Sequence, residues 1–194
     1  MDEDEMGEYQ LELEDGTIAK SSREFTGKAK ATYPLRGETY TGDFKDGVRH
    51  GNGKYTYGHG DVYEGEFREN LKHGIGKLIY RQKGETEEDP TIEKGVYHGY
   101  FESGVRHGEG VFMYPNGNVY SGYWKDGKKH GKGVFVFLEE KMKFKGEWAE
   151  GSMISGTWEF HNGVHFRGGF ENNKPQGEGV WVFPNGNVAN GNYK

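Results

Sequence analysis

The chain has 194 residues, of which 32% are apolar, 29% are charged and 34 are glycine, and its formal charge at pH 7 is -6. The apolar fraction is too small for a thick two-layer core, but the 13 Tyr, 12 Phe and 4 Trp residues exceed what a disordered chain contains. The absence of cysteine excludes disulfides, thiolate metal sites and cysteine nucleophiles, and no apolar run reaches the roughly 18 residues of a membrane-spanning helix. We therefore expect a thinly folded, soluble and intracellular protein.

The N-terminal segment is strongly acidic. Residues 1–15 contain eight of the 31 acidic residues and no Lys or Arg, so the remainder of the chain is close to neutral. A near-neutral body lacks the basic patch that nucleic-acid binding requires, so we expect no nucleic-acid partner. We interpret residues 1–15 as a solvated acidic tail, with an interaction arm as the alternative. Residues 16–39 are interpreted as a degenerate half-repeat that caps the N-terminal end.

One short pattern recurs six times between residues 40 and 188. It consists of an aromatic residue, any residue, Gly, any residue and a second aromatic residue, and its occurrences start near residues 40, 63, 97, 120, 144 and 166. The longest step, of 34 residues, contains an insertion at about 81–94, which we expect to be a charged surface loop without its own function. Residues 189–194 begin a further repeat, which predicts an open sheet edge.

Each repeat is predicted to form a β-hairpin. Apolar residues alternate by two along both blocks of the repeat, so Tyr120, Gly122 and Trp124 share one face of a strand. Antiparallel pairing then places these rings over glycines of the neighbouring strand, which lack side chains to pack. The predicted aromatic ladder consists of Tyr40, Phe44, Tyr63, Phe67, Tyr97, Phe101, Tyr120, Trp124, Phe144, Trp148, Phe166 and Phe170.

The links between strands are expected to be of two kinds. Asn-Gly pairs such as Asn116-Gly117 favour tight turns with positive φ at one end of the hairpins. Longer loops, such as residues 46–50, are expected at the other end. The result is an all-β fold, an elongated single-layer antiparallel meander of stacked hairpins about 60 Å long, at roughly 4.8 Å per strand.

The full repeat resembles a known family. The phrase Tyr-x-Gly-x-Trp/Phe-x-x-Gly-x-x-His-Gly-x-Gly, clearest at 40–53 and 120–133, resembles the MORN (membrane occupation and recognition nexus) repeat. A small acidic chain made of little else is similar to the MORN subunits of the radial spoke head. That resemblance implies a non-catalytic scaffold in the cytoplasm and cytoskeleton, at the axoneme of a cilium or flagellum. It implies other radial spoke head subunits as partners, and a homodimer through the open sheet edge is a secondary expectation.

Recurring histidines and glycine pairs do not predict chemistry. His50, His73, His107 and His130 occupy equivalent positions, which the meander separates by about 10 Å, too far for a shared metal ion. The Gly-x-Gly pairs lie within predicted strands rather than before a helix, so we interpret them as packing positions and not as a phosphate-binding loop. No nucleophile elbow or zinc-binding helix is present. We therefore predict no enzymatic activity and no catalytic, cofactor-binding or metal-binding residue.

Basic residues cluster in the segments that carry the histidines. A row of such cations would suit an anionic membrane, because each is worth about 1 kcal/mol near an anionic bilayer surface. Acidic residues beside them cancel much of this field, so we favour a solvated rim. A membrane-associated adaptor that binds anionic lipids stays the alternative function. The predicted basic loop rim consists of Arg49, Lys72, Arg106, Lys128, Lys129 and Lys174.

The face of the sheet opposite the aromatic ladder changes its character along the chain. In the first repeat this second face is polar, with Thr41, Asp43 and Lys54, whereas repeats three, four and six carry apolar or aromatic residues there. Exposed apolar patches usually mark interaction sites, so we expect a partner protein to dock on it. The alternative is that the tail or a neighbouring segment covers the patch. The predicted partner-binding face consists of Tyr100, Val111, Met113, Tyr123, Val134, Val136, Val180 and Val182.

Overall fold

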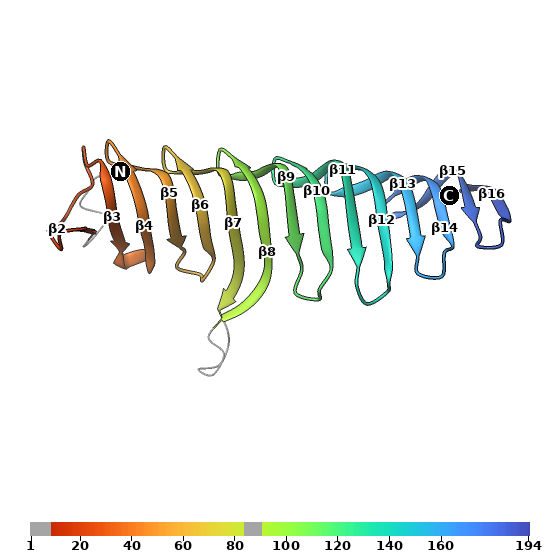
Figure 1. Ribbon diagram of the computed structural model, residues 1–194, viewed down its shortest axis with the longest axis horizontal. Coiled ribbons are helices and arrows are strands. Elements are labelled where there is room, and N and C mark those ends of the chain that lie inside the picture. Colours follow the sequence, from red (N-terminus) through yellow and green to blue (C-terminus); the bar gives the residue numbers. More distant parts are fainter. Residues whose placement is uncertain (1–8, 84–90) are drawn as a thin grey trace. The chain divides into compact units, whose positions relative to one another are not determined.

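A computed structural model of the chain, which describes residues 9–83 and 91–194, is almost entirely antiparallel β-structure (Figure 1). Sixteen strands form one open meander, in which each strand from β3 to β16 neighbours the next in sequence and β1 lies between β3 and β2. This confirms the predicted all-β meander. The strands are β1 (Gln10–Leu13), β2 (Ile18–Ala19), β3 (Gly27–Tyr33), β4 (Glu38–Lys45), β5 (Val48–Thr56), β6 (Val62–Arg68), β7 (Leu71–Lys83), β8 (Thr91–Glu102), β9 (Val105–Met113), β10 (Val119–Lys125), β11 (Lys128–Phe137), β12 (Met142–Ala149), β13 (Ser152–Phe160), β14 (His165–Glu171), β15 (Lys174–Val182) and β16 (Val188–Tyr193).

Contacts group the chain into two compact units, Met1–Val105 and Arg106–Lys194, and each is described by itself. The described residues contain one short 3-10 turn, η2 (Pro34–Arg36), as their helical element. No helix in these residues is long and apolar enough to cross a membrane.

In the first unit, two segments differ from what the sequence predicts. Residues 10–13, which were expected to lie in a solvated tail, form β1, because Leu11 is buried opposite Ala31 of β3. The insertion was expected to be a loop over 81–94, but its two ends extend β7 and β8, with Arg81 opposite Glu93 and Lys83 opposite Thr91. Residues 1–8 and the remainder of the insertion, 84–90, lie outside the described residues.

Aromatic rings lying on bare backbone form the core of each repeat. The Tyr40 side chain is fully buried, and its hydroxyl donates a hydrogen bond to the carbonyl oxygen of Asp43 at 2.8 Å. A Cβ atom at Gly53, on the neighbouring strand, would lie only 2.4 Å from the Tyr40 ring. The same arrangement recurs around Tyr63 and Tyr120. Glycine is therefore required under these three rings, as the alternation in the sequence predicts, and all twelve residues of the aromatic ladder are buried.

The turns at the two ends of the hairpins are the reverse of the expectation. The segment expected to be a longer loop, at residues 46–50, contains a two-residue turn in which Asp46 and Gly47 have φ of 50° and 84°. Positive φ at both positions is the type I′ geometry. At the other end, residues 115–117 form a three-residue loop in which only Gly117 has positive φ, at 81°. The loop at residues 161–163 has the same backbone hydrogen bonds and the same positive φ at its last glycine, although His161 stands where Pro115 does, so this three-residue loop does not depend on the proline.

Each two-residue turn is also bound to the hairpin that precedes it. The Gly127 amide donates to the Arg106 carbonyl oxygen at 2.9 Å, and the Gly151 amide donates to the Lys129 carbonyl oxygen at 3.1 Å. Asn70 makes the same backbone bond to Arg49, and its side-chain oxygen accepts a further bond from the Arg49 amide. These bonds hold successive hairpins in register, and they place the residue after each turn at a fixed position on the sheet.

Candidate interaction surfaces

The aromatic face, which carries the aromatic ladder, also presents a second row of rings. These rings lie two residues after an inward-facing residue of the second strand in each hairpin. Tyr57 follows Tyr55 at a centroid distance of 4.6 Å, and Phe137 follows Phe135 at 4.4 Å. The period-two alternation that identifies the ladder predicts this row as well, although the ladder as defined from the sequence omits it. The row consists of Tyr33, Tyr57, Tyr80, Tyr114, Phe137, Phe160 and Phe183, which are half-buried or exposed.

Four residues of the predicted basic loop rim lie on the aromatic face instead. The Arg106 guanidinium lies 4.3 Å from the centroid of the Trp124 ring, and the Lys129 ammonium lies 4.7 Å from that of Trp148. Arg49 and Lys72 make equivalent cation–π contacts in the first unit. Burial lowers the pKa of Lys129, with a smaller contribution from the Arg106 charge. These four cations therefore pack against the rings of the aromatic face and contribute to the fold.

The remaining two residues of that rim, Lys128 and Lys174, are exposed. Lys128 pairs with Glu150, and this contact raises the pKa of the lysine and lowers that of the glutamate. Because the turn before it has only two residues, Lys128 is already part of a strand, and it faces away from Lys129. The predicted rim is consequently split between the two faces of the sheet and does not form one row.

The repeated histidines follow these cations by one residue. His50, His73, His107 and His130 are each partly exposed within the second strand of their hairpins. Among residues 9–83 and 91–194, no group of three or more His, Cys, Asp or Glu side chains is arranged to hold a metal ion.

A compact apolar patch lies on the second face of the sheet in the second unit. Val119 of β10 is opposite Met113 of β9 on one side and Val136 of β11 on the other. In the next row, Val111 and Val134 flank Ser121 in the same way. Met113, Val136 and Val111 are 47%, 39% and 37% exposed. We call Val111, Met113, Val119, Val134 and Val136 the second-face patch; Val119 is the member that the sequence analysis missed.

Other residues of the predicted partner-binding face lie outside this patch. Tyr123 is one row further along β10, where interaction with Glu109 raises the pKa of its hydroxyl. Val180 and Val182 lie on β15, separated from the patch by β12, β13 and β14, whose side chains in the same rows include Lys143, Glu159 and Arg167. Tyr100 belongs to the first unit, beside Ile75 of β7. The single predicted face therefore divides into separate regions.

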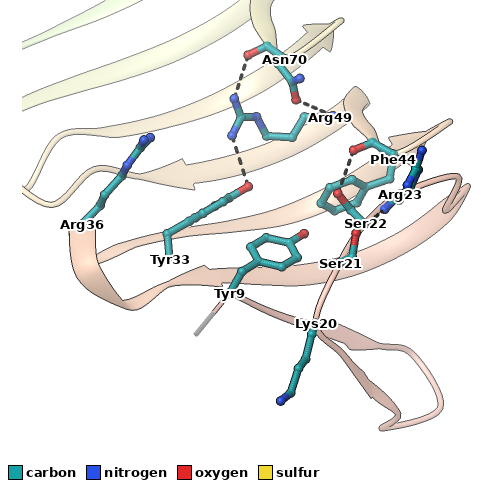
Figure 2. Close-up of a pocket in the computed structure, with 11 residues that line it drawn as sticks. Tyr9, Lys20, Ser21, Ser22, Arg23, Tyr33, Arg36, Phe44, Arg49 and Asn70 are labelled. Atoms are coloured by element: carbon teal, nitrogen blue, oxygen red, sulfur yellow. Dashed lines mark hydrogen bonds between the residues drawn. The ribbon is translucent and has the colours of Figure 1, made fainter. Parts of the chain in front are cut away.

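A cavity of about 390 Å³ opens at the N-terminal end of the first unit (Figure 2). It lies among Tyr9, which precedes β1, the segment of residues 20–23, strands β3 to β5 with η2, and Asn70. Its lining combines the rings of Tyr9, Tyr33 and Phe44 with the guanidinium of Arg49. The sequence gives little sign of this cavity, because residues of the first two repeats form it together with residues 9, 20–23, 33 and 36, which lie outside the regular repeats.

Comparisons with known proteins identify a family and a fold. A family model described as the MORN repeat matches residues 40–62, 63–84, 97–119, 120–137 and 166–188; the expected repeat near residue 144 is not matched. A solved structure of the SAS-4 (dCPAP) TCP domain in complex with a proline-rich motif of Ana2 (dSTIL), from Drosophila melanogaster, is similar in fold. Its TM-score is 0.51 at 17% sequence identity, and the match covers 95% of this chain and 88% of that chain. No curated protein sequence matches the chain.

Proposed function

Because this chain belongs to the MORN repeat family, we propose that it is a non-catalytic scaffold that binds a partner protein through the second face of its sheet. The observation that carries this proposal is the second-face patch. Its five side chains lie side by side on three adjacent strands, and three of them are more than a third exposed. Exposed apolar groups gathered in this way favour docking of a partner, since their burial is the main driving force of association.

The surroundings of the patch indicate which kind of partner segment fits it. On β12, Lys143 lies opposite Val136, and Lys145 lies opposite Val134. Both lysines are exposed, and Lys143 pairs with Glu159 at 2.9 Å. A segment that is apolar on one side and carries carboxylates along its edge would bury the patch and meet Lys145. We propose that the partner presents an amphipathic, acidic segment of this kind.

The similar solved structure supports a role in protein binding. In that structure the SAS-4 TCP domain is in complex with a proline-rich motif of another protein. A meander sheet of similar fold is thus compatible with holding a segment of a partner. The finer part of our proposal is a radial spoke head subunit of the axoneme in cilia or flagella, with the other spoke head subunits as partners. This finer part rests on the resemblance of the chain, which is small, acidic and composed mainly of MORN repeats, to the MORN subunits of the radial spoke head.

Charging the patch tests the docking surface. The double variant Val134→Asp with Val136→Lys places charges in the centre of the patch, and we expect it to abolish binding of spoke head proteins while the sheet stays folded. Lys54 and Thr56 occupy the equivalent positions in β5, so Lys54→Asp with Thr56→Lys introduces the same residues elsewhere and should leave binding intact. Equal capture by the wild type and the Val134/Val136 variant would reject the patch as the docking surface.

A pull-down from ciliated and non-ciliated cells tests the proposed location. We expect radial spoke head proteins to be enriched from the ciliated cells and to be lost with the Val134/Val136 variant. Salt-sensitive flotation of the protein with anionic vesicles, without enrichment of axonemal proteins, would instead favour a membrane-associated adaptor and contradict the scaffold proposal. The split of the basic residues between the two faces favours the first outcome.

A further inference from the structure

The cavity at the N-terminal end of the first unit is strongly cationic. Four of the residues that line it are basic, and none of the described lining residues is Asp or Glu. This contrasts with the chain as a whole, which carries a formal charge of -6. A concave site lined by one sign of charge concentrates the opposite charge, so the cavity favours an anion. The four basic residues are Lys20, Arg23, Arg36 and Arg49.

Arg49 is held in a fixed orientation at this cavity. Its backbone amide donates to the side-chain oxygen of Asn70 at 2.9 Å, and one terminal nitrogen donates to the Asn70 carbonyl oxygen at 3.1 Å. The other terminal nitrogen donates a hydrogen bond to the Tyr33 hydroxyl oxygen at 3.4 Å. The guanidinium lies 4.8 Å from the centroid of the Tyr55 ring. These contacts position the group without using its Nε–H. Figure 2 shows Tyr33 reaching up to Arg49, with Tyr9 beside it and Lys20 extending away from them.

Two buried polar atoms at this cavity have no hydrogen-bond partner within the described part of the chain. They are the Nε of Arg49 and the hydroxyl of Tyr9, whose side chain is only 9% exposed. The nearby Ser22 hydroxyl donates its proton to the Gly47 carbonyl oxygen at 2.9 Å. A buried polar atom left unpaired is destabilising. Two such atoms in one cationic cavity indicate a ligand that accepts hydrogen bonds.

The Tyr9 hydroxyl is available as a donor. Burial raises its pKa, while interactions with Ser22 and Arg49 act in the opposite direction with smaller effect. The hydroxyl therefore keeps its proton at neutral pH. An anion in the cavity would accept one hydrogen bond from this hydroxyl and a second from the Arg49 Nε–H.

We propose that this cavity binds an aryl phosphate monoester. The phosphate would accept hydrogen bonds from Tyr9 and Arg49, and a basic lining without carboxylates suits its double negative charge better than the single charge of a carboxylate. The volume of about 390 Å³ exceeds the needs of a phosphate ion, and the rings of Tyr33 and Phe44 provide apolar walls for an attached aromatic ring. The site lies in a different unit from the second-face patch, so this inference is independent of the proposed scaffold function.

Titration calorimetry with the full chain tests the ligand class. Phenyl phosphate should bind with one-to-one stoichiometry, at least tenfold more tightly than inorganic phosphate or benzoate, and the affinity should fall as salt is added. An aryl phosphate can come from a protein side chain or from a small molecule, and a peptide with one phosphotyrosine distinguishes these two sources. Tighter binding of the peptide than of phenyl phosphate would assign the ligand to a protein side chain, and equal binding would assign it to a small molecule. Failure of phenyl phosphate to bind, or equal binding of benzoate, would overturn the proposal.

Two variants test the site itself. Tyr9→Phe removes a buried hydroxyl that has at most a weak interaction with Ser22 in the described part of the chain, so we expect a tenfold or greater loss of affinity with little change in thermal stability. Arg49→Lys should give a similar loss while folding normally, since Lys72 and Lys129 occupy the equivalent positions of other repeats. Tyr57→Phe, on a tyrosine that does not line the cavity, is the matched control and should bind normally. Unchanged affinity in both Tyr9→Phe and Arg49→Lys would contradict the assignment.

Discussion

The hairpins β4–β5 and β10–β11 have the same aromatic face and different second faces. Tyr40 and Tyr120 are both fully buried, and their hydroxyls donate to the carbonyl oxygen three residues later at 2.8 and 3.1 Å. On the second face, the pair Lys54 and Thr56 of β5 is replaced by Val134 and Val136 in β11. The ring packing is preserved across this exchange of polar for apolar residues.

This difference separates the requirements of folding from those of binding. The aromatic face determines the geometry of the hairpin, because a ring, the glycines beneath it and the tyrosine hydrogen bond must all fit together. Residues of the second face point away from this packing, so they are free to vary with little effect on the fold. A MORN sheet therefore supplies a constant framework on one face and a variable surface on the other.

Removing the buried ring should have the largest effect, and it should be similar in both hairpins. We expect Tyr40→Ala and Tyr120→Ala each to lower the free energy of unfolding by about 3–5 kcal/mol, since each leaves a cavity over bare backbone. Urea denaturation followed by far-UV circular dichroism measures both, since all four Trp residues lie in the second unit and would not report on Tyr40. Phe183→Ala, at a ring that is already 39% exposed, is the control and should cost much less. A large effect in one hairpin and a negligible effect in the other would refute the idea of a shared framework.

Adding a methyl group beneath the ring should have the next largest effect. A Cβ at Gly133 would lie 2.4 Å from the Tyr120 hydroxyl oxygen, so Gly133→Ala must displace the ring and should cost about 3 kcal/mol. Gly127 has open space around it but a φ of 78°, so Gly127→Ala adds backbone strain alone and should cost about 1 kcal/mol. Comparing the two urea midpoints isolates the contribution of the ring. Equal costs would indicate that backbone strain, and not ring packing, makes glycine necessary.

The framework was predictable from sequence because it repeats, whereas the surfaces depend on details that repetition does not reveal. Alternation around Tyr120 gives the strands, the buried rings and the glycines beneath them. The turn type was predicted wrongly, because an Asn-Gly pair such as Asn116-Gly117 also fits a three-residue loop in which only the glycine has positive φ. That error placed Lys129 in a loop, although it lies in a strand over aromatic rings. The cavity beside Tyr9 was missed because part of its wall comes from residues 9–36, which lie outside the regular repeats.

Exchanging the second faces should affect stability much less. The double variant Val134→Lys with Val136→Thr transfers the β5 residues into β11, and we expect it to change the free energy of unfolding by less than about 1 kcal/mol, because Val136 is already 39% exposed. Binding of the proposed partner should nevertheless be lost. Urea denaturation and the pull-down described above give the two measurements. Extensive unfolding of this variant would mean that the second face also supports the framework.

The smallest expected effect concerns the cation within the ring stack. The position of Lys129 is occupied in the next hairpin by Met153, which is fully buried opposite Trp148. Burial lowers the pKa of Lys129 below its ordinary value of 10.5, so losing the proton is easier in the folded state than in the unfolded chain. Its charge therefore opposes folding at neutral pH, even though it lies near aromatic rings. We expect Lys129→Met to raise the free energy of unfolding at pH 7 by less than about 1 kcal/mol.

The pH dependence of this variant provides a further check of the cause. As pH rises from the lowered pKa of the folded state toward 10.5, the folded wild type loses the proton on Lys129 before the unfolded chain does, so its stability increases. Lys129→Met lacks this titrating group. The difference in free energy of unfolding between the variant and the wild type should therefore become smaller over that pH range. Lys128→Met, at an exposed position on the other face, should show no such narrowing. If Lys129→Met is less stable than the wild type at pH 7, the attraction between cation and rings outweighs the cost of burying the charge.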